Sequence, residues 1–495
     1  MIDFFSWISV YPEIVLLVMA CVVALVDLLD TSAQRNLAYV LSLLTLTALA
    51  LLTGAYALSG EVVHGFFNSV LSDPLSNWLK CFAALSMLAT FAYAKDYVGQ
   101  RGMLRGAEWY VLGLLALLGC FVLISADNFL LIYLGLECLT LASCALVALR
   151  RDHTGALEAA MKYFVLGSLA SGVLLYGLSM LYGAAGTLSV NEVLGIVAGG
   201  GVKPVALVFA LVFVVAGLAF KLGAAPFHMW VPDVYQGAPT AVTLLIGTVP
   251  KLAAFAMAIR LLVQGLLPLA QDWQLMLALL AVASLLLGNL AAIMQTNLKR
   301  MLAYSTISHM GFVLLGLMSG VVDADVQTAA NAYSAAMFYM VTYVLTTLAA
   351  FGLMLALARK GFESEEIADF AGLHQRQPLY AAVMALVMFS LAGVPPLAGF
   401  QGKLVVLQAL VAAGRPLYTA LAVFAVLISV VGAFYYLRVI KVMYFDEAAE
   451  DTPIAAQPDM QALLALNGVL LLFYGILPGG LLALCSEAVL RMLQH

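Results

Sequence analysis

Long apolar segments separated by short polar ones follow one another along almost the whole chain. A helix needs about 20 apolar residues to cross the hydrocarbon core of a bilayer, where it must satisfy its own backbone hydrogen bonds. Reading the apolar runs against glycine, proline and charge predicts fourteen such spans. They cover residues 10–29, 36–57, 71–94, 107–125, 127–149, 158–185, 204–225, 238–264, 272–294, 298–319, 328–357, 378–411, 416–445 and 459–490.

The composition supports a membrane protein and excludes several other classes. Of the 495 residues, 64% are hydrophobic and 10% are charged, whereas a soluble domain carries about 25% charged residues. The net charge of −5 is small and the basic residues are scattered, so we expect no binding of nucleic acid. The predicted fold class is therefore an all-α polytopic membrane protein.

The sequence shows no motif for a cofactor. The six cysteines lie in apolar segments without a Cys-x-x-Cys pair, so they indicate neither disulfides nor a zinc or iron–sulfur site. The sequence also lacks a Gly-rich nucleotide-binding loop and a cluster of metal ligands. We expect no cofactor and no metal in this chain, so the energy for any transport must come from elsewhere.

The basic residues are distributed unevenly between the two sets of loops. The loops after odd-numbered spans hold thirteen of the 22 Lys and Arg residues, namely Arg35, Lys95, Arg101, Arg105, Arg150, Arg151, Lys299, Arg300, Arg359, Lys360, Arg376, Arg438 and Lys441. Four lie in the loops of the other side, namely Lys203, Arg260, Arg415 and Arg491. Since cytoplasmic loops are enriched in Lys and Arg, both termini are predicted to face away from the cytoplasm.

Five lysines remain, and all of them fall inside predicted spans: Lys80, Lys162, Lys221, Lys251 and Lys403. A charge at the centre of a span costs about 2.5–3.5 kcal/mol on insertion scales. Lys80 and Lys162 lie near span ends, where a lysine can extend its ammonium group to the interface. Lys221 and Lys403 lie deeper and need another reason.

The seventh span is too long for one straight helix. Residues 204–235 would form a helix of about 48 Å, against a hydrocarbon core of about 30 Å. Gly223 and Pro226 mark the expected break, because proline lacks an amide proton and clashes with the preceding turn. Lys221 then lies beside the break, at membrane depth.

The twelfth span, residues 378–411, repeats this arrangement. Pro395 and Pro396 interrupt it, and Lys403 follows. The eighth span has a similar feature in Val249-Pro250-Lys251. Broken helices in corresponding positions of two halves point to an ion path, because freed backbone groups are tolerated at depth only in a wet cavity or inside protein.

The two broken spans predict an internal repeat. Spans four to eight and nine to thirteen each have the break in their fourth member, and because five is odd, the two groups must insert in opposite directions. The predicted division is a three-helix segment at residues 1–106, a first five-helix unit at 107–264, a second, inverted unit at 272–445 and a final helix at 459–495.

Buried polar residues provide candidates for a proton path. Span five holds a lone carboxylate away from its ends, Glu137, which we expect to pair with Lys221, either as a functional or as a purely structural pair. Removal from water favours a neutral lysine and a nearby carboxylate favours a charged one, so a moving Glu137 would act as a switch. The candidate path comprises Glu137, Lys221, Lys251 and Lys403, with Lys162, His228, Lys299, Tyr304 and His309 as possible relays.

Some of these residues also fit ordinary structural roles. His309 and Tyr304 fit satisfied polar residues between helices, and Lys299 fits a cytoplasmic anchor. Asp73 and Lys80 are seven residues apart, on one helix face, and are expected to pair.

Five segments of the chain carry a family resemblance. They are LGLECLTLASCALVAL around Glu137, EAAMKYFVLGSLASGVLLYGLSMLYGAAGTL around Lys162, FKLGAAPFHMWVPDVYQGAPTAVTLLIGTVPK from Lys221 to Lys251, LAYSTISHMGF around His309 and SLAGVPPLAGFQGK before Lys403. Together they resemble the antiporter-like membrane subunits of proton-pumping NADH–quinone oxidoreductase, respiratory complex I, and most of all its subunit N branch. The resemblance covers most of the chain, from span three to span thirteen.

The resemblance implies a fold, a function and a set of residues. It implies fourteen helices with two inverted five-helix units, helices 7 and 12 being discontinuous, and proton translocation through Glu137, Lys221, Lys251 and Lys403. It also implies a non-redox subunit of an H⁺-translocating enzyme of the respiratory electron-transport chain, in the inner membrane of a bacterial cell. NADH, FMN, iron–sulfur clusters and quinone are then expected in partner subunits, and sister antiporter-like subunits are expected as neighbours in the membrane arm.

Three alternatives remain open at this point. They are a subunit of a multi-subunit cation/proton antiporter, a self-contained secondary transporter, and a scaffold that only fills a membrane arm. Among the sister subunits, one typically has a glutamate where this chain has Lys403, and another carries a long lateral helix after the last span, whereas this sequence stops at His495. A solute carrier predicts a substrate-sized pocket between the repeats, and a pump subunit predicts a thin polar line of lysines across both.

Overall fold

The computed structural model describes residues 4–30, 32, 35–200, 202–321, 326–359, 361–447 and 457–494. Its first part contains α1 (Phe4–Ser9), α2 (Tyr11–Asp27), α3 (Asn36–Ser59), β1 (Val63–Gly65), β2 (Val70–Ser72), α4 (Pro74–Gln100), α5 (Glu108–Ser125), α6 (Phe129–Val147), α7 (Thr154–Ala185), α8 (Val190–Ala198), α9 (Pro204–Leu222), α10 (Trp230–Gly237) and α11 (Thr240–Ala258). A π-helix, η1 (Ile259–Gly265), and a 3-10 turn, η2 (Leu267–Leu269), follow. The second part contains α12 (Ala270–Ile293), α13 (Leu298–Met318), α14 (Val326–Leu357), η3 (Ile367–Phe370), α15 (Leu373–Arg376), α16 (Pro378–Ala392), α17 (Ala398–Ala412), α18 (Pro416–Phe445), α19 (Pro458–Ile476) and α20 (Gly479–Gln494).

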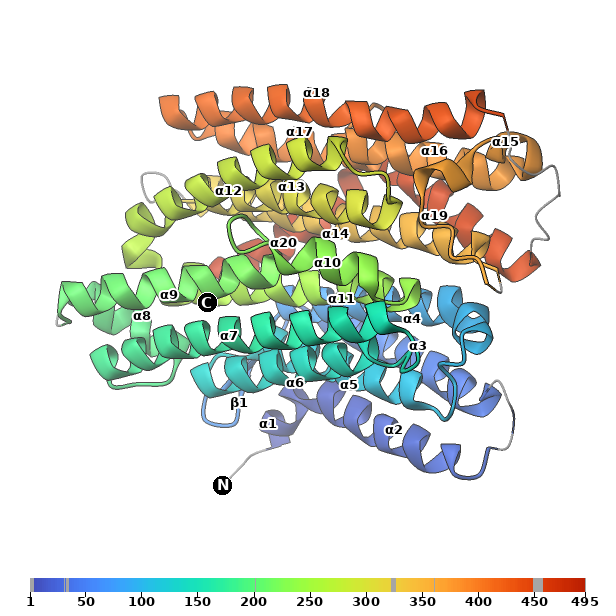
Figure 1. The fold of residues 1–495 in the computed structure, drawn as a ribbon. Coiled ribbons are helices and arrows are strands. Elements are labelled where there is room, and N and C mark those ends of the chain that lie inside the picture. The colour runs from blue at the N-terminus through green and yellow to red at the C-terminus, as the bar shows by residue number, and fades with distance from the viewer. Residues whose placement is uncertain are drawn as a thin grey trace.

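Long helices aligned along one direction make up the molecule (Figure 1). Twelve helical segments of the described residues are long and apolar enough to cross a membrane. Together with α2, which has 17 residues, and the pair formed by α16 and α17, they match the fourteen predicted spans. The all-α polytopic fold predicted from the sequence is confirmed.

The loops rich in Arg and Lys meet at one end of the bundle. There Arg101 donates from Nη2 to the carbonyl oxygen of Arg359 at 2.7 Å, and Arg150 forms an ion pair with Glu363 at 2.7 Å. We call this the basic end, and the opposite end, which carries α8 and the β1–β2 hairpin, the α8 end (Figure 1). Lys360, one of the predicted loop residues, lies outside the described residues.

Two spans are broken at the predicted places. α9 ends at Leu222, and Gly223 follows in the left-handed conformation with a φ of 79°. α16 ends at Ala392, and Gly393 follows with a φ of 88°. Glycine adopts this conformation without the clash that a Cβ atom would cause, so it suits both helix ends.

Two expectations about the continuity of the spans are wrong. Pro250 does not interrupt the eighth span, because α11 continues through it, and the missing amide of one proline leaves only a single carbonyl without its usual donor. The last span, in contrast, is divided into α19 and α20 around Leu477 and Pro478. Pro478 cannot donate within a helix and two glycines follow it, which favours a break there.

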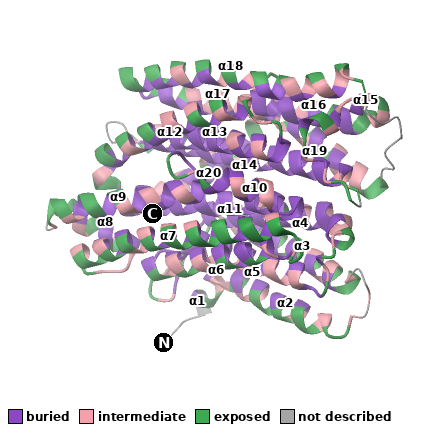
Figure 2. Ribbon diagram, in the orientation of Figure 1, coloured by how far each residue is buried: buried purple, intermediate pink, exposed green. Residues whose placement is uncertain are grey.

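Burial separates the helices into an inner and an outer set (Figure 2). The span Thr240–Gly265, which contains α11, is 100% buried over its apolar window, and those of α13 and α14 are 94% and 89% buried. The spans of α7 and α18 are only 33% buried. A helix that is apolar on all sides is expected in such an interior, surrounded by other helices.

Candidate proton path

Lys221 lies in the last turn of α9, beside the first break. Its buried ammonium group donates a hydrogen bond to Oγ1 of Thr140 on α6 at 2.9 Å. Glu137, one turn earlier on α6, is partly exposed. Its carboxylate is near enough to favour the charged form of Lys221 but does not form an ion pair with it. The predicted direct pair of Glu137 and Lys221 is therefore wrong, because three residues along a helix leave two side chains about 60° apart, and it is Thr140 that faces α9.

Lys251 connects α11 to the break in α9. Its Nζ donates to the carbonyl oxygen of Leu222 at 2.8 Å and lies 5.4 Å from the centre of the Trp230 ring. Leu222 is the last residue of α9, so its carbonyl has no partner within the helix. The C-terminal end of a helix carries partial negative charge, which stabilises a cation. The broken helix thus offers Lys251 a negative environment without a carboxylate.

Lys403 occupies the corresponding place at the second break. It lies on α17 and reaches back across the break, donating to the carbonyl oxygens of Leu391 at 3.0 Å and Ala392 at 2.9 Å. A third hydrogen bond goes to Oγ of Ser429 on α18 at 2.7 Å. An ammonium group has three protons, so all its donors are used here. Both breaks therefore place a lysine at the carbonyl end of a half-helix.

His309 on α13 is buried and contacts two tyrosine hydroxyls. Its Nδ1 lies 2.6 Å from the hydroxyl of Tyr339 on α14, and its Nε2 lies 3.1 Å from the hydroxyl of Tyr436 on α18. The hydroxyl of Tyr436 also lies 2.5 Å from Oγ of Ser305. A neutral imidazole donates at one nitrogen and accepts at the other, so His309 can accept a proton on one side and release it on the other.

Tyr343 and Tyr235 extend these polar groups from His309 towards Lys251. The ring of Tyr343 lies 5.4 Å from that of His309. Tyr343 donates to Oγ1 of Thr306 at 2.8 Å, and Tyr235 on α10, which is fully buried, also lies near Thr306. Its ring lies 6.4 Å from that of Trp230, which also contacts Lys251. Tyr235 therefore stands between the two halves of the candidate path.

Ion pairs join the two predicted units towards the basic end. Asp233 on α10 pairs with Lys162 on α7 at 2.9 Å and with Arg300 on α13 at 2.8 Å. Lys162 also pairs with Glu158, on its own helix, at 2.9 Å, and its side chain is 43% exposed. Lys162 is thus a partly exposed group whose partners both lie in the first unit, and it is the pair of Asp233 and Arg300 that joins the two units.

The remaining relay candidates differ in their surroundings. Lys299 is buried, donates to the carbonyl oxygen of Ala238 at 2.6 Å and pairs with Glu365 at 2.9 Å. Since Ala238 lies between α10 and α11, Lys299 also joins the two units rather than only anchoring a loop. His228 lies in the loop between α9 and α10, and Tyr304 lies on α13; both are partly exposed, and no hydrogen bond joins either side chain to a central lysine.

Lys80 does not pair with Asp73, contrary to the prediction. Its ammonium group forms a buried ion pair with Glu13 on α2 at 2.6 Å. Asp73 is the N-cap of α4 and pairs with Arg260 in η1 at 2.7 Å. The N-cap role holds the Asp73 carboxylate at the start of its own helix, away from Lys80 on the following turns.

Several contacts of the path lacked a signal in the sequence. Thr140 and Ser429 are hydroxyl residues of a kind common in apolar helices, and the carbonyl acceptors at the breaks belong to the backbone. Tyr339 and Tyr343 did carry a signal, because residues four apart share a helix face. Asp233 also stands in the segment between Lys221 and Lys251, where it is the only acidic residue.

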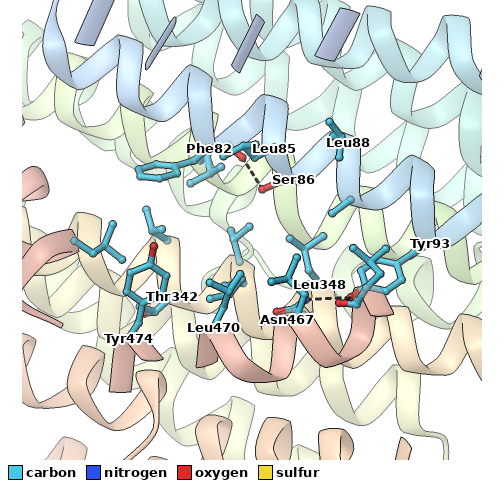
Figure 3. Close-up of a pocket in the computed structure, with 18 residues that line it drawn as sticks. Phe82, Leu85, Ser86, Leu88, Tyr93, Thr342, Leu348, Asn467, Leu470 and Tyr474 are labelled. Carbon is cyan, nitrogen blue, oxygen red and sulfur yellow. Dashed lines mark hydrogen bonds between the residues drawn. The ribbon is translucent and has the colours of Figure 1, made fainter. Parts of the chain in front are cut away.

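The cavity shown in Figure 3 has a volume of about 290 Å³ and lies between α4, α14 and α19. Hydrophobic side chains form most of its wall, and the Tyr93 hydroxyl and the Asn467 amide bind each other at 3.3 Å. A polar solute would lose its water here without gaining a charged partner. None of Lys221, Lys251 and Lys403 lines this cavity.

Among the residues that the structure describes, no group of three or more His, Cys, Asp or Glu side chains is placed to hold a metal ion. The six cysteines are free thiols on five helices, with Cys138 and Cys144 both on α6. The residues present therefore do not fit an iron–sulfur cluster, which requires several converging thiolates.

Similarity to known proteins extends over nearly the whole chain. Residues 126–429 match the family model described as NADH:quinone oxidoreductase/Mrp antiporter, TM. A protein of Polaromonas naphthalenivorans named NADH-quinone oxidoreductase subunit N is 63% identical over 491 residues, which cover 99% of this chain and 98% of that protein. The chain belongs to the subunit N family of NADH–quinone oxidoreductase. The subunit N of Herminiimonas arsenicoxydans is 55% identical over 489 residues, 98% of each chain.

Two solved structures show how far the fold of this subunit N family member is shared with other complexes. A chain of respiratory complex I from Thermus thermophilus with bound aureothin is 33% identical, with a TM-score of 0.77 over 95% of this chain and 98% of that one. A chain of the Mrp complex from Dietzia sp. DQ12-45-1b has a TM-score of 0.85 at 20% identity, over 99% of this chain and 98% of that one. The fold is thus shared with an Mrp complex, whereas sequence identity places the chain with subunit N. The resemblance seen in the sequence is confirmed.

Proposed function

We propose that this chain translocates protons as a membrane subunit of NADH–quinone oxidoreductase, driven by redox chemistry in other subunits. The observation that carries the proposal is the pair of broken helices, each with a lysine at its freed carbonyls. Lys251 meets Leu222 at the first break, and Lys403 meets Leu391 and Ala392 at the second. Each ammonium group is held by neutral dipoles, so it can lose its proton without leaving a buried carboxylate unpaired.

The proposed path runs from Glu137 and Lys221 through Lys251 and the network around His309 to Lys403. Hydrogen bonds and close ring contacts of the described residues support its central part. Lys299 is proposed to couple the two units through its hydrogen bond to the carbonyl oxygen of Ala238. Lys162 is proposed to act on the same contact region through Asp233, which also pairs with Arg300. His228 and Tyr304 would take part only through water.

A groove along the second half of α17 supports an outlet for protons. It has a volume of about 480 Å³, lies between α14, α17 and α20, and is lined in part by Asn331, Ser334, Gln408 and Ser486. Gln408 follows Lys403 by five residues on α17, in the direction of the α8 end. A groove with such polar groups can hold the water that carries a proton onward.

The chain is an integral multi-pass membrane protein, and its orientation is part of the proposal. The excess of Lys and Arg in the loops of the basic end supports a cytoplasmic position for that end. Both termini then lie on the periplasmic side of a bacterial inner membrane. The division into residues 1–106, 107–264, 272–445 and 459–495, with the second five-helix unit inverted, is supported by the matching positions of the two breaks.

The proposal also assigns the redox chemistry to other chains. NADH, FMN, iron–sulfur clusters and quinone would be bound by partner subunits, and sister antiporter-like subunits would flank this one in the membrane arm. The apolar lining of the cavity in Figure 3 argues against a carrier of polar solutes. A cation/proton antiporter shares the fold, and the experiment below separates it from a redox-driven subunit.

The test uses the whole complex reconstituted in liposomes, with NADH oxidation and internal acidification measured together. In the Lys221→Ala variant we expect assembly to persist and coupled proton movement to fall by about tenfold or more, because a positioned proton-transfer group contributes about 100-fold or more to its step. Glu137→Ala is expected to act in the same direction.

Lys203→Ala is the matched control, because Lys203 is an exposed lysine at the start of the same helix, α9. It is expected to leave proton movement unchanged. Full proton movement in an assembled Lys221→Ala complex would favour a scaffold. Proton movement that requires a sodium gradient and ignores NADH would favour an antiporter.

A further inference from the structure

A second buried polar group of residues lies at the α8 end, apart from the path described above. Asp127, in the turn between α5 and α6, has an exposed fraction of 0%. Asp73, the N-cap of α4, and Arg260, in the π-helix η1, are each 1% exposed. Together with Asn191 on α8 they form what we call the α8-end cluster.

The charges in the α8-end cluster do not cancel. Arg260 forms an ion pair with Asp73 through Nη2 at 2.7 Å, and its Nη1 donates a hydrogen bond to Oε1 of Gln264 at 2.7 Å. Asp127 accepts one side-chain hydrogen bond, from Asn191 to its Oδ2 at 2.8 Å, and its Oδ1 has no hydrogen-bond partner among the described residues. With both aspartates ionised, two carboxylates would share one guanidinium away from water, which is unfavourable.

The groups around Asp127 come from three elements. Arg260 in η1 favours its charged form, whereas Asp73 at the start of α4 and Glu192 on α8 oppose that form. Burial is the largest effect and raises the pKa of Asp127 to about 6. Burial acts in the same direction on Asp73, but the guanidinium of Arg260 holds the pKa of Asp73 below its ordinary value. Asp73 therefore stays ionised, and Asp127 is the member of the cluster that can take a proton.

We propose that Asp127 is a proton-binding site at the α8 end of the first unit. A proton on its unpartnered Oδ1 removes the excess negative charge of the cluster and turns that oxygen into a donor. The role of this site in translocation rests on the function proposed above, whereas proton binding itself does not.

The backbone connects the site to a central lysine. Arg260 and Lys251 lie nine residues apart in one buried helical segment, Thr240–Gly265, which corresponds to about 13 Å. A shift of this segment that accompanies a change at Lys251 would also move Arg260 relative to Asp127. Since a nearby cation favours the ionised carboxylate, such a shift would change the proton affinity of Asp127.

Infrared spectroscopy of the purified complex tests proton binding directly. The C=O stretching band of a protonated carboxylic acid is followed as the pH is raised, in the wild type, in Asp127→Asn and in Glu192→Gln. Asn is close to Asp in size and keeps an acceptor for Asn191. Glu192 is a matched control, because it is an exposed carboxylate on the adjoining helix α8.

We expect one carboxylic acid band in the wild type that disappears around pH 6, is absent from Asp127→Asn and persists in Glu192→Gln. A titration that is the same in Asp127→Asn and the wild type would overturn the proposal. Asn191→Ala gives a second test if Asp127→Asn does not assemble. Loss of this donor should shift the band titration upward by about one pH unit, a tenfold tighter proton binding, and an unshifted titration would contradict the site.

The outcome also separates this inference from the function proposed above. If the Asp127 band titrates as expected but Lys221→Ala still moves protons normally, the proton-binding site stands and the proposed path fails. If Lys221→Ala stops proton movement but no Asp127 band is found, the path stands and this site fails.

Discussion

Lys251 donates a hydrogen bond from Nζ to the carbonyl oxygen of Leu222, the last residue of the broken helix α9, at 2.8 Å. This hydrogen bond joins a helix that is buried throughout its span to a helix end inside the protein. A charged ammonium group offsets the partial negative charge of that end, whereas a neutral amine does not. The protonation of Lys251 is therefore linked to the stability of the break.

Replacing Lys251 by Met removes the charge while keeping much of the side-chain length. We expect coupled proton movement to fall by about tenfold or more. The free energy of unfolding should change by less than about 2 kcal/mol, because the unpaired Leu222 carbonyl and the removed cost of burying an amine have opposite effects. Proteoliposome assays and thermal unfolding of the purified complex measure the two quantities. Normal proton movement in the variant would place Lys251 outside the path.

Tyr436→Phe removes the hydroxyl that lies between His309 and Ser305. We expect slower coupled proton movement and a destabilisation of about 1–2 kcal/mol from the lost hydrogen bonds. Tyr418→Phe is the matched control, because Tyr418 is a buried tyrosine on the same helix whose hydroxyl donates to the carbonyl oxygen of Met318 instead, at 3.3 Å. Equal transport rates in the two variants would count against a relay through His309.

The buried pair of Glu13 and Lys80 allows a double-mutant test. Lys80→Met or Glu13→Leu alone leaves a buried charge without its partner and should destabilise the chain by about 3–5 kcal/mol. The double variant should recover most of that loss, because apolar groups of similar volume can replace a buried pair. Thermal unfolding of all four forms gives the coupling energy, and additive losses would mean that the two groups do not act as a pair.

Asp127 also predicts how stability depends on pH. Its folded-state pKa, about 6, lies above the ordinary value of 3.8, so the unfolded chain releases this proton first as the pH rises. The contribution of Asp127 to stability is therefore lost between about pH 4 and pH 6 and stays low above that range. Asp127→Asn should abolish this slope and unfold at a higher temperature than the wild type above pH 6. A parallel pH profile of the two proteins would contradict the assignment.

Local residue chemistry predicted most of the fold. The fourteen spans follow from segment length and hydropathy, and the breaks follow from Gly223 and the prolines near it and from Pro395 and Pro396. Pro250 shows the limit of this reasoning, since α11 continues through it although proline is unfavourable inside a helix. The break before α20 was missed, although Pro478 and the glycines after it carried the signal.

The pairing of charges was predicted less well, because it depends on helix rotation. Lys221 contacts a hydroxyl rather than Glu137, and Lys80 pairs with Glu13 rather than with Asp73. The burial of Lys221 was predicted, whereas Lys80 was expected to reach the interface and is fully buried. In both cases the partner was set by which faces of two helices meet. The glycines and prolines predicted that backbone carbonyls would be freed at the breaks, but not that Lys251 and Lys403 would bind them.

The enclosure of the span Thr240–Gly265 has a consequence for the speed of the transport cycle. A helix with neighbours on every side cannot swing between two orientations unless the contacts around it separate. Side-chain rotations take picoseconds to nanoseconds, whereas collective motions of whole domains take microseconds to milliseconds. A shift of this segment therefore has to move its neighbours as well, so any step of the cycle that includes such a shift is expected on the slower of these timescales.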